Sequence, residues 1–449
     1  SAGHHRTAES ETGGHEVNGR DGNGRDKPPP RPGMWTRRRR RFVSLLQVGV
    51  GLKRWAVVGA VGVAIWSIGF AWLIRQFFDL KFPNFLPWYL EGFLFLIVGS
   101  GSILAALWGF YRKLSPVLLG SQSIENMADQ IYNRWSRGRG PKIVAIGGGT
   151  GLSVLLRGLR VHTDNLTAII TVADDGGSSG RLRRELGVLP PGDFRNCLVA
   201  MSEDESLLGE LFQYRFDEGD GLKGHSFGNL FIVAMSHVTQ SFEQALVESS
   251  HVLAVRGQVV PATLANLSLK VRFTDGVVVE GESNISHHGG KIAEISIDPV
   301  DAPGHPLAVQ AIEEAEIVVI GPGSLYTSIL PNLLVPDISD AIRRTSAPVI
   351  YACNVATEVG ETQGFAIAEH METLRQFTFR EIADYVVANN AKLNLRPDYP
   401  GDPVVDDGRS IAPAKLELAD LSNSERPIRH DSEKLAAAVM NVYRKNRLS

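Results

Sequence analysis

The sequence has very little cysteine. Only Cys197 and Cys353 occur among its 449 residues, far apart and each in an apolar context. Two such residues cannot supply a disulfide framework or a cysteine zinc site. We therefore expect the folded part of the chain to work in a reducing compartment.

An excess of charge of either sign is also missing. Lys and Arg number 46 against 49 Asp and Glu, which gives a net charge of −3. This balance excludes a protein that binds nucleic acid through a global positive field, and we expect no nucleic-acid partner. The apolar share of 43% and the charged share of 21% are ordinary for globular chains and exclude wholesale disorder.

Residues 1–41 lack the apolar side chains needed for a core. They are rich in Gly, His, Arg and Pro and end in the run Arg37 to Arg41, which predicts a disordered basic tail. An arm for nucleic acid is one interpretation of the arginines. Their place directly before an apolar stretch favours the cytoplasmic end of a membrane helix.

Residues 42–113 contain two long runs that lack charge. Residues 55–74 have none, and residues 88–110 have only Glu91. Each run has the roughly 20 residues that cross about 30 Å of hydrocarbon. Buried helices of a soluble domain are the alternative, but tryptophans near the ends favour a transmembrane hairpin. The Arg and Lys excess outside the intervening loop predicts an inner-membrane protein with both termini and the main domain in the cytoplasm.

The rest of the chain is expected to comprise a linker, residues 114–140, and an α/β domain, residues 141–449. Short apolar runs that end in glycine-rich turns predict a Rossmann-like parallel sheet with flanking helices. The expected strands are 142–146, 166–172, 317–320, 348–352 and 385–388. Between residues 259 and 298 the period changes to two, around a turn at 274–276, which predicts a small antiparallel insertion.

A first glycine cluster, Gly147-Gly148-Gly149-Thr150-Gly151, follows the first expected strand and precedes an amphipathic stretch. Glycines allow close approach of a ligand, and amides at a helix N-terminus favour a phosphate. The cluster differs from the dinucleotide fingerprint because Leu152 stands where a third glycine is needed, and it lacks the Gly-Lys-Ser/Thr ending of a P-loop. A nicotinamide-dependent oxidoreductase is correspondingly disfavoured.

The second expected strand ends in Asp174 and Asp175, followed by a Gly/Ser loop that includes Ser178. One aspartate could bind a ribose, cap the next helix or hold Mg²⁺ together with ligand phosphates. We expect a ligand role for at least one of them. Which aspartate would contact a metal stays open.

A third glycine cluster contains Gly321, Gly323 and Ser324 and again follows an apolar strand. Two phosphate-binding turns at the carboxyl ends of parallel strands suit a pyrophosphate. Asn354 follows the next strand, and the polar loop after it could orient a sugar or cap a helix.

The remaining polar residues give weaker signals. Asp193 is expected to be a helix N-cap, and His225 could be a general base or a structural residue. His287 and His288 are expected at a loop tip. No catalytic residue can be assigned.

The glycine clusters, together with residues 171–181 and 225–229, resemble the YvcK family of gluconeogenesis factors within the CofD-like superfamily. The likeness covers about residues 142–443. It implies a protein that binds a UDP-sugar, UDP-N-acetylglucosamine in the first place, and that acts in cell shape and envelope synthesis during gluconeogenic growth. CofD relatives transfer a phospho group from a nucleotide diphosphate donor with Mg²⁺, which is the alternative. YvcK-like members resemble regulators without established turnover.

The resemblance also implies that Thr150 and Asp174 lie near the phosphates and that Tyr399 and Arg429 help to hold the nucleotide. Asp174 and Asp175 are the candidates for Mg²⁺. Envelope-synthesis proteins and a second copy of the chain are the expected protein partners. The full set of expected ligand-binding residues is Gly147, Gly148, Gly149, Thr150, Gly151, Asp174, Asp175, Ser178, Asn229, Gly321, Gly323, Ser324, Asn354, Tyr399 and Arg429.

Overall fold

The computed structural model describes residues 140–202, 207–393 and 399–448, together with isolated positions 63, 64, 67, 138 and 395. The basic tail, nearly all of the expected hairpin and most of the linker lie outside these ranges. The transmembrane hairpin therefore stays a prediction. Among the residues that the structure describes, no helix is long and apolar enough to span a bilayer.

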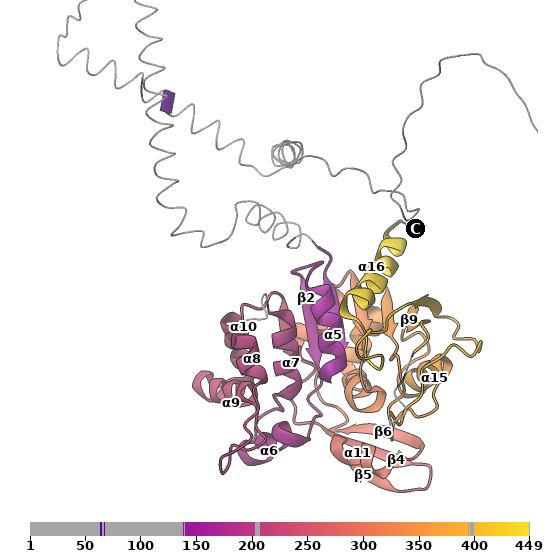
Figure 1. Cartoon of the computed structure of the whole chain (residues 1–449), viewed down its shortest axis with the longest axis horizontal. Helices are drawn as coiled ribbons and strands as arrows, with labels where there is room; N and C mark the ends of the chain where they lie inside the picture. The colour runs from indigo at the N-terminus through magenta and orange to yellow at the C-terminus, as the bar shows by residue number, and fades with distance from the viewer. Residues whose placement is uncertain are drawn as a thin grey trace, which may run out of the picture. The chain divides into compact units, whose positions relative to one another are not determined.

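A seven-stranded parallel sheet forms the centre of the domain (Figure 1), which confirms the α/β prediction. Most of its strands are apolar and buried along their whole length, as expected for a sheet that helices cover on both faces. In spatial order the strands are β10 (Lys415–Ala419), β9 (Tyr385–Asn389), β8 (Val349–Ala352), β7 (Ile317–Ile320), β1 (Ile143–Gly147), β2 (Leu166–Ile170) and β3 (Gln258–Pro261).

The helices connect and cover these strands. Helix α5 packs against α7 and α16, and α12 packs against α14. The elements are α5 (Gly149–Leu159), α6 (Gly177–Leu186), α7 (Gly192–Met201), α8 (Leu207–Gln213), α9 (Phe227–Thr239), α10 (Phe242–Val252), α12 (Pro306–Glu313), the π-helical turn η1 (Leu325–Ile329), α13 (Leu330–Leu333), α14 (Pro336–Arg344), α15 (Ile367–Phe377) and α16 (Ser432–Leu448).

The strand order changes direction between β1 and β7. From β1 the chain proceeds to β2 and β3 on one side, whereas β7 lies on the other side of β1 and is followed outward by β8, β9 and β10. Open α/β sheets bind ligands at such a switch point, outside the carboxyl ends of the strands. Both glycine clusters follow the two strands that meet there.

A separate antiparallel sheet has the order β5 (Val278–Glu280), β4 (Ser268–Phe273) and β6 (Ile292–Asp298), with α11 (Glu282–His288) between β5 and β6. The predicted insertion is confirmed, but its expected start is wrong. Residues 259–261 belong to β3, which pairs in parallel with β2 in the main sheet. The period of two therefore begins only at β4.

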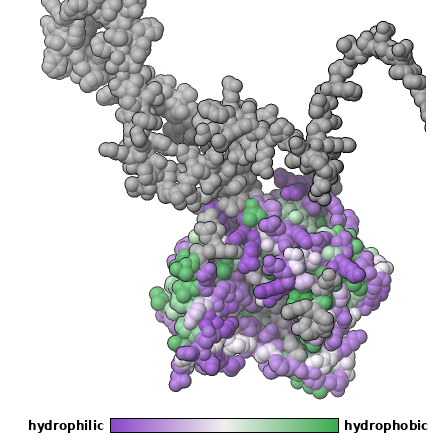
Figure 2. All heavy atoms as spheres, in the orientation of Figure 1, coloured by the Kyte–Doolittle hydropathy of each residue, from purple (hydrophilic) through white to green (hydrophobic). Residues whose placement is uncertain are grey.

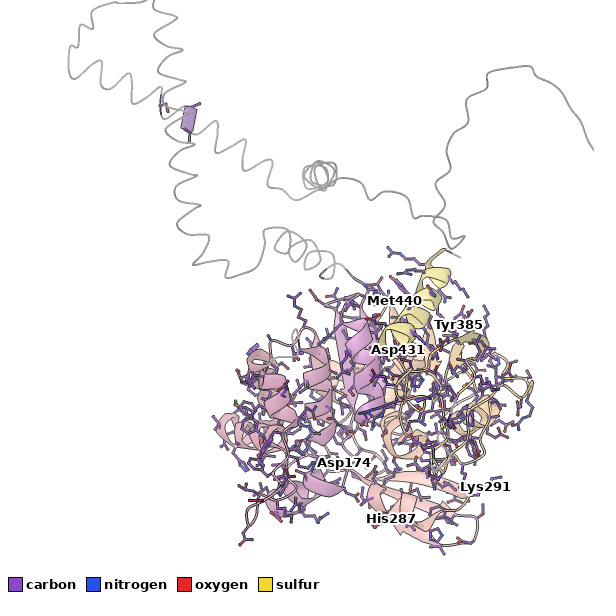
Figure 3. All side chains as sticks on the ribbon, in the orientation of Figure 1. Asp174, His287, Lys291, Tyr385, Asp431 and Met440 are labelled. Atoms are coloured by element: carbon purple, nitrogen blue, oxygen red, sulfur yellow. The ribbon has the colours of Figure 1, made fainter. Side chains whose placement is uncertain are left out.

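The end of the sheet that bears the switch point faces this small sheet. Figure 3 shows Asp174 close to the three-stranded sheet that carries His287 and Lys291, whereas Tyr385 and Met440 lie toward the opposite end. The two histidines were expected at a loop tip, but they form the last turn of α11. His288 Nε2 lies 3.1 Å from Asp275 Oδ2, so this histidine holds the β4–β5 turn.

The face of the domain seen in Figure 2 is mostly polar. Figure 2 shows apolar side chains gathered near helices α8 to α10, and Leu207, Val238 and Val247 are among the exposed apolar residues of those helices. Single exposed apolar residues are normal on a folded domain.

Candidate functional site

A cavity of about 430 Å³ opens at the carboxyl ends of β2, β1, β7 and β8. This volume lies within the usual range for small-molecule sites. It is lined by Gly148, Gly149, Thr150, Gly151, Val154, Thr171, Asp174, Asp193, Glu282, Gly323, Ser324, Thr327, Ser328, Asn354, Val355, Ala356, Glu358, Tyr399, Ile428, Arg429 and His430. Ten of the residues expected from the sequence are in this set, and Gly147, Asp175, Ser178, Asn229 and Gly321 are not.

The two glycine turns approach each other closely at this cavity. A Cβ atom on Gly151 would lie 2.6 Å from the carbonyl oxygen of Pro322 and 2.9 Å from the Cα atom of Gly323. Contacts that short leave no room for a side chain. Gly151 is therefore required for the two turns to share one cavity wall.

Two buried asparagines fix the geometry of the turns. The Asn354 side chain accepts a hydrogen bond from the Gly323 amide at 3.2 Å and donates one to the Gly323 carbonyl at 3.0 Å. Asn332 donates to the carbonyl of Gly147 at 3.0 Å and to that of Ser328 at 2.8 Å. Through these bonds each turn is held by a side chain from elsewhere in the domain, so its backbone is ordered before any ligand arrives.

Helix α5 begins inside the first turn. Its N-cap residue is Gly148, which has no side chain that could satisfy the first amides, and Gly149 has a φ of +64° that favours glycine. The Gly149 amide donates to the carboxyl group of Asp193. The following amides, of Thr150 and Gly151, begin the helix at the cavity and suit an anion.

One wall of the cavity is acidic. It carries Asp174 from the loop after β2, Asp193 from α7 and Glu282 from α11. Burial and the neighbouring Asp174 charge raise the pKa of Asp193 to about 7. Burial and the charges of Asp174, Asp175, Glu361 and Asp193 raise the pKa of Glu282 to about 8. Near neutral pH, Asp193 and Glu282 are therefore each present in both the protonated and the ionised form.

Asp174 and Asp175 have different surroundings. Asp174 lines the cavity, its Oδ1 accepts a hydrogen bond from the Gly176 amide at 2.9 Å, and burial raises its pKa. Asp175 Oδ1 instead accepts from the amide and the hydroxyl of Ser283, at 2.9 and 2.6 Å. Asp175 thus attaches α11 to the main sheet and lies outside the cavity wall. In the described part of the chain, no three His, Cys, Asp or Glu side chains form a metal site.

Ser178 and Asn229 belong to a buried polar cluster that is separate from the cavity lining. The Ser178 hydroxyl lies 2.9 Å from His225 Nδ1 and accepts a hydrogen bond from Asn229 Nδ2 at 3.1 Å. His225 is only 3% exposed, and burial together with Arg181 lowers its pKa. These contacts join α6 to the start of α9, which favours the structural interpretation of His225.

The opposite wall is formed by Tyr399 and the segment Ile428 to His430. Tyr399 donates from its hydroxyl to the Thr357 carbonyl at 2.9 Å, which fixes the ring beside the loop after β8. Arg429 is exposed and is the one Lys or Arg among the described residues that line the cavity. A guanidinium group at this position suits an anionic ligand.

Asp193, Glu282 and His430 are among the lining residues that were not in the expected set. Asp193 was expected as an N-cap, but Pro191 caps α7 and Asp193 lies in its first turn. Glu282 begins α11, between β5 and β6, and His430 precedes the last helix. Asp193 carried no local signal of a place at the strand ends, because its helix α7 follows α6 and not a strand.

Comparison with known proteins places this architecture in a family. The family model of 2-phospho-L-lactate transferase CofD matches residues 143–448. A putative gluconeogenesis factor of Nostoc sp. (strain PCC 7120) is 44% identical over 422 residues, which are 89% of this chain and 92% of that protein. The gluconeogenesis factor of Bacillus subtilis (strain 168) is 42% identical over 315 residues, 68% of this chain and 99% of that protein.

A solved structure agrees with the fold. A member of the UPF0052 family from Bacillus halodurans is 41% identical, with a TM-score of 0.64 over 67% of this chain and 99% of that chain. The chain belongs to the gluconeogenesis factor (YvcK) family and contains a CofD-like domain. The family predicted from the glycine clusters is thereby confirmed.

Proposed function

We propose that the protein is a regulator that binds a UDP-sugar, with UDP-N-acetylglucosamine as the first candidate. The observation that supports this most strongly is the meeting of two helix-start turns at Gly151 and Gly323 around one cavity. The first turn begins α5 at this volume and the second precedes η1 there, and two such helix starts suit the two phosphates of a nucleoside diphosphate. Arg429 provides a further cation for this group.

The regulatory part of the proposal concerns the cell envelope. Ligand occupancy would shift the population of a conformation that envelope-synthesis proteins bind, and the protein would thereby act on cell shape during gluconeogenic growth. The two apolar runs, 55–74 and 88–110, would anchor the domain at the inner membrane with both termini in the cytoplasm. Alkaline carbonate tests the anchor, because extraction of the full chain would exclude a membrane-spanning hairpin.

A transferase of the CofD type is the second candidate, and the acidic wall favours it. Asp174 and Asp193 lie beside the proposed diphosphate, where two carboxyl groups repel a bare anion. A Mg²⁺ ion prefers carboxylates together with phosphate oxygens, so these two side chains fit such an ion. When bound, the ion would neutralise charge on the phosphates. The pKa of about 7 belongs to Asp193 without the ion, and a bound Mg²⁺ would lower it and favour the ionised carboxylate.

Calorimetric titration of the full chain in detergent micelles separates these functions. UDP-N-acetylglucosamine, a guanosine diphosphate donor and NAD are the three ligands, each with and without Mg²⁺. Saturable binding of the UDP-sugar without a product in mass spectrometry supports the regulator. Release of UMP or transfer of a group supports the transferase. Binding of NAD alone would contradict both.

A further inference from the structure

His430 lies in the cavity wall at the end of a segment that is held on both sides. The Asn423 amide donates to the Arg429 carbonyl at 3.0 Å, and the Asp431 amide donates to the Leu421 carbonyl at 2.8 Å. The position of the His430 backbone is therefore set by its two sequence neighbours.

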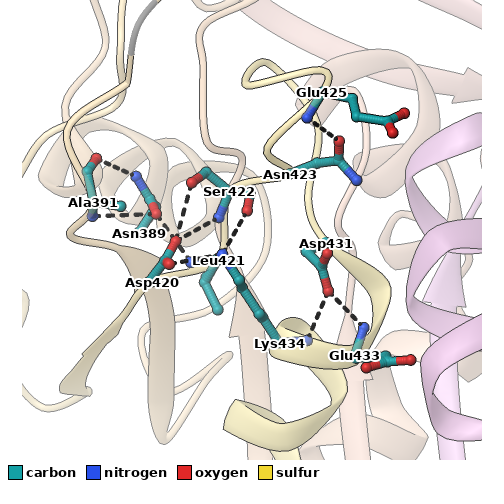
Figure 4. A network of polar contacts seen from close by, with 10 residues as sticks. All are labelled: Asn389, Ala391, Asp420, Leu421, Ser422, Asn423, Glu425, Asp431, Glu433 and Lys434. Atoms are coloured by element: carbon teal, nitrogen blue, oxygen red, sulfur yellow. Dashed lines mark hydrogen bonds and ion pairs between the residues drawn. The ribbon is translucent and has the colours of Figure 1, made fainter. Parts of the chain in front are cut away.

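A network of side chains holds the same segment at its base (Figure 4). Asn389 Oδ1 at the end of β9 accepts a hydrogen bond from the Leu421 amide at 3.0 Å, and the Lys434 ammonium group bonds Asp420 at 2.7 Å. Asp431 Oδ1 accepts from the amides of Glu433 and Lys434 at 3.0 and 3.1 Å, which caps α16. The segment that carries His430 is thus tied to the main sheet and to the last helix.

The His430 ring can adopt only one tautomer here. Its Nε2 atom lies 3.0 Å from the carbonyl oxygen of Cys353, at the end of β8. A carbonyl oxygen only accepts, so Nε2 carries the proton. Burial lowers the pKa of His430 to about 4, so that the ring is neutral at physiological pH. Nδ1 is therefore left with a lone pair and no proton, and it can only accept a hydrogen bond.

This acceptor is open to a ligand. Among the residues that the structure describes, none donates to Nδ1, and Nδ1 is not one of the enclosed polar atoms that lack a partner. The residue is nevertheless buried, with 7% of its surface exposed, and it lines the cavity. A ligand that fills this end of the cavity would cover a fixed acceptor, which costs free energy unless the ligand supplies a donor.

The wall around His430 suits a nucleobase better than a sugar. It combines the apolar Val355 and Ile428 with the aromatic ring of Tyr399. Among the described residues, its one carboxyl group is that of Glu358, which accepts a hydrogen bond from Asn354 Nδ2 at 3.3 Å. Asp174, Asp193 and Glu282 belong to the other wall. Carboxylates are good acceptors for sugar hydroxyl groups, and flat apolar surfaces suit a base. The glycine turns lie between the two walls, where the diphosphate is proposed.

We propose that His430 Nδ1 accepts a hydrogen bond from the imino N–H of a nucleobase and thereby selects uracil over cytosine. This inference rests on the proposed nucleotide-sugar function and specifies which base the site accepts. Uracil carries a hydrogen on N3, whereas N3 of cytosine carries a lone pair. Cytosine would set two lone pairs against each other, and we expect it to bind about 10- to 100-fold more weakly.

The test compares UDP, CDP and 3-methyl-UDP on the full chain in micelles, because all three share one diphosphate and one ring size. We expect the wild-type protein to bind UDP about 10- to 100-fold more tightly than either of the other two. Equal affinity for UDP and 3-methyl-UDP would overturn the inference and leave the proposed function intact. If no uridine nucleotide bound at all, the proposed function itself would fail.

Two variants assign the preference to His430. An asparagine at this position has an amide that can donate to the Cys353 carbonyl and an oxygen that can accept, so His430→Asn should keep the preference for UDP over CDP. His430→Phe keeps a ring but has no acceptor, and we expect UDP to fall to the affinity of CDP. A folded His430→Phe protein that still prefers UDP would refute the assignment. The 3-methyl-UDP comparison on the wild-type protein decides the question if this variant does not fold.

Discussion

Replacement of Gly151 by alanine tests whether the two glycine turns must touch. The added Cβ atom would lie 2.6 Å from the Pro322 carbonyl oxygen, and ordinary contacts begin near 3.4 Å. The turns would therefore have to separate by about 0.8 Å. Gly151 has no positive φ, so the backbone itself permits alanine. The expected effect comes from this separation alone.

The magnitude follows from two opposing terms. Overpacking costs about 1 to 3 kcal/mol, whereas alanine stabilises a helix by about 1 kcal/mol relative to glycine. We expect a net loss in the free energy of unfolding of about 0 to 2 kcal/mol. A displacement of this size also lengthens one or two amide bonds to a charged phosphate, each worth about 1.5 to 3 kcal/mol. UDP-N-acetylglucosamine should therefore bind at least about tenfold more weakly.

Isothermal titration and thermal unfolding measure these two effects separately. Gly147→Ala is the matched control, because nothing lies closer than 3.7 Å to its added Cβ atom. Gly158→Ala is the control for stability alone, since its Cβ atom would meet the Ser432 backbone between α5 and α16. A folded Gly151→Ala protein with wild-type affinity would show that contact between the turns is not needed for binding.

Three further predictions concern the cavity walls. Asn354→Leu removes both hydrogen bonds to Gly323 and should lower the melting temperature and the affinity for UDP together. Unchanged affinity in calorimetry would argue against a turn that is ordered before the ligand binds. The pKa of Asp193 rises from 3.8 to about 7 on folding, so the folded protein holds this proton more tightly than the unfolded chain does. The stabilisation that comes from the bound proton is lost as pH rises from about 4 to 7. At pH 8.5 the Asp193→Asn protein should therefore have a higher melting temperature than the wild type, and its free energy of unfolding should be larger by up to about 4 kcal/mol. Below pH 4 we expect no gain. Without Mg²⁺, UDP affinity should fall between pH 6 and 9 as Asp193 and Glu282 ionise, and added Mg²⁺ should reduce the fall; a flat profile in both conditions would refute an acidic wall beside the phosphates.

The sheet and its glycine turns were predictable because their signals are local. The strands β1, β2, β7, β8 and β9 are short apolar runs, and the turns after β1 and β7 are rich in glycine. Strand β10, Lys415–Ala419, was missed because it alternates charged and apolar residues at the sheet edge and follows a long loop. Its alternating pattern is that of a surface strand, and no neighbouring segment of the sequence indicates the strand with which it pairs.

The lining residues that were missed depend on contacts between distant segments. Glu282 reaches the cavity because Asp175 bonds Ser283, 108 positions away in the sequence, and His430 does so because its ring meets the Cys353 carbonyl, 77 positions away. Neither pairing leaves a periodic or compositional signal. Asp193 was misassigned because helix α7 starts one residue before it, and boundaries of elements are the least certain part of a sequence-based prediction.

The acidic wall draws on both sheets, because Asp174 follows β2 of the seven-stranded sheet whereas Glu282 lies between β5 and β6 of the small one. Glu282 is carried by the three-stranded sheet, whereas Gly148 and Gly323 follow strands of the seven-stranded one. An exchange of residues 264–298 with those of another family member would alter the charge at the cavity and leave the backbone of the glycine turns unchanged. Sequence change in the small sheet can therefore alter the charge at the cavity without a change in the glycine turns of the main sheet.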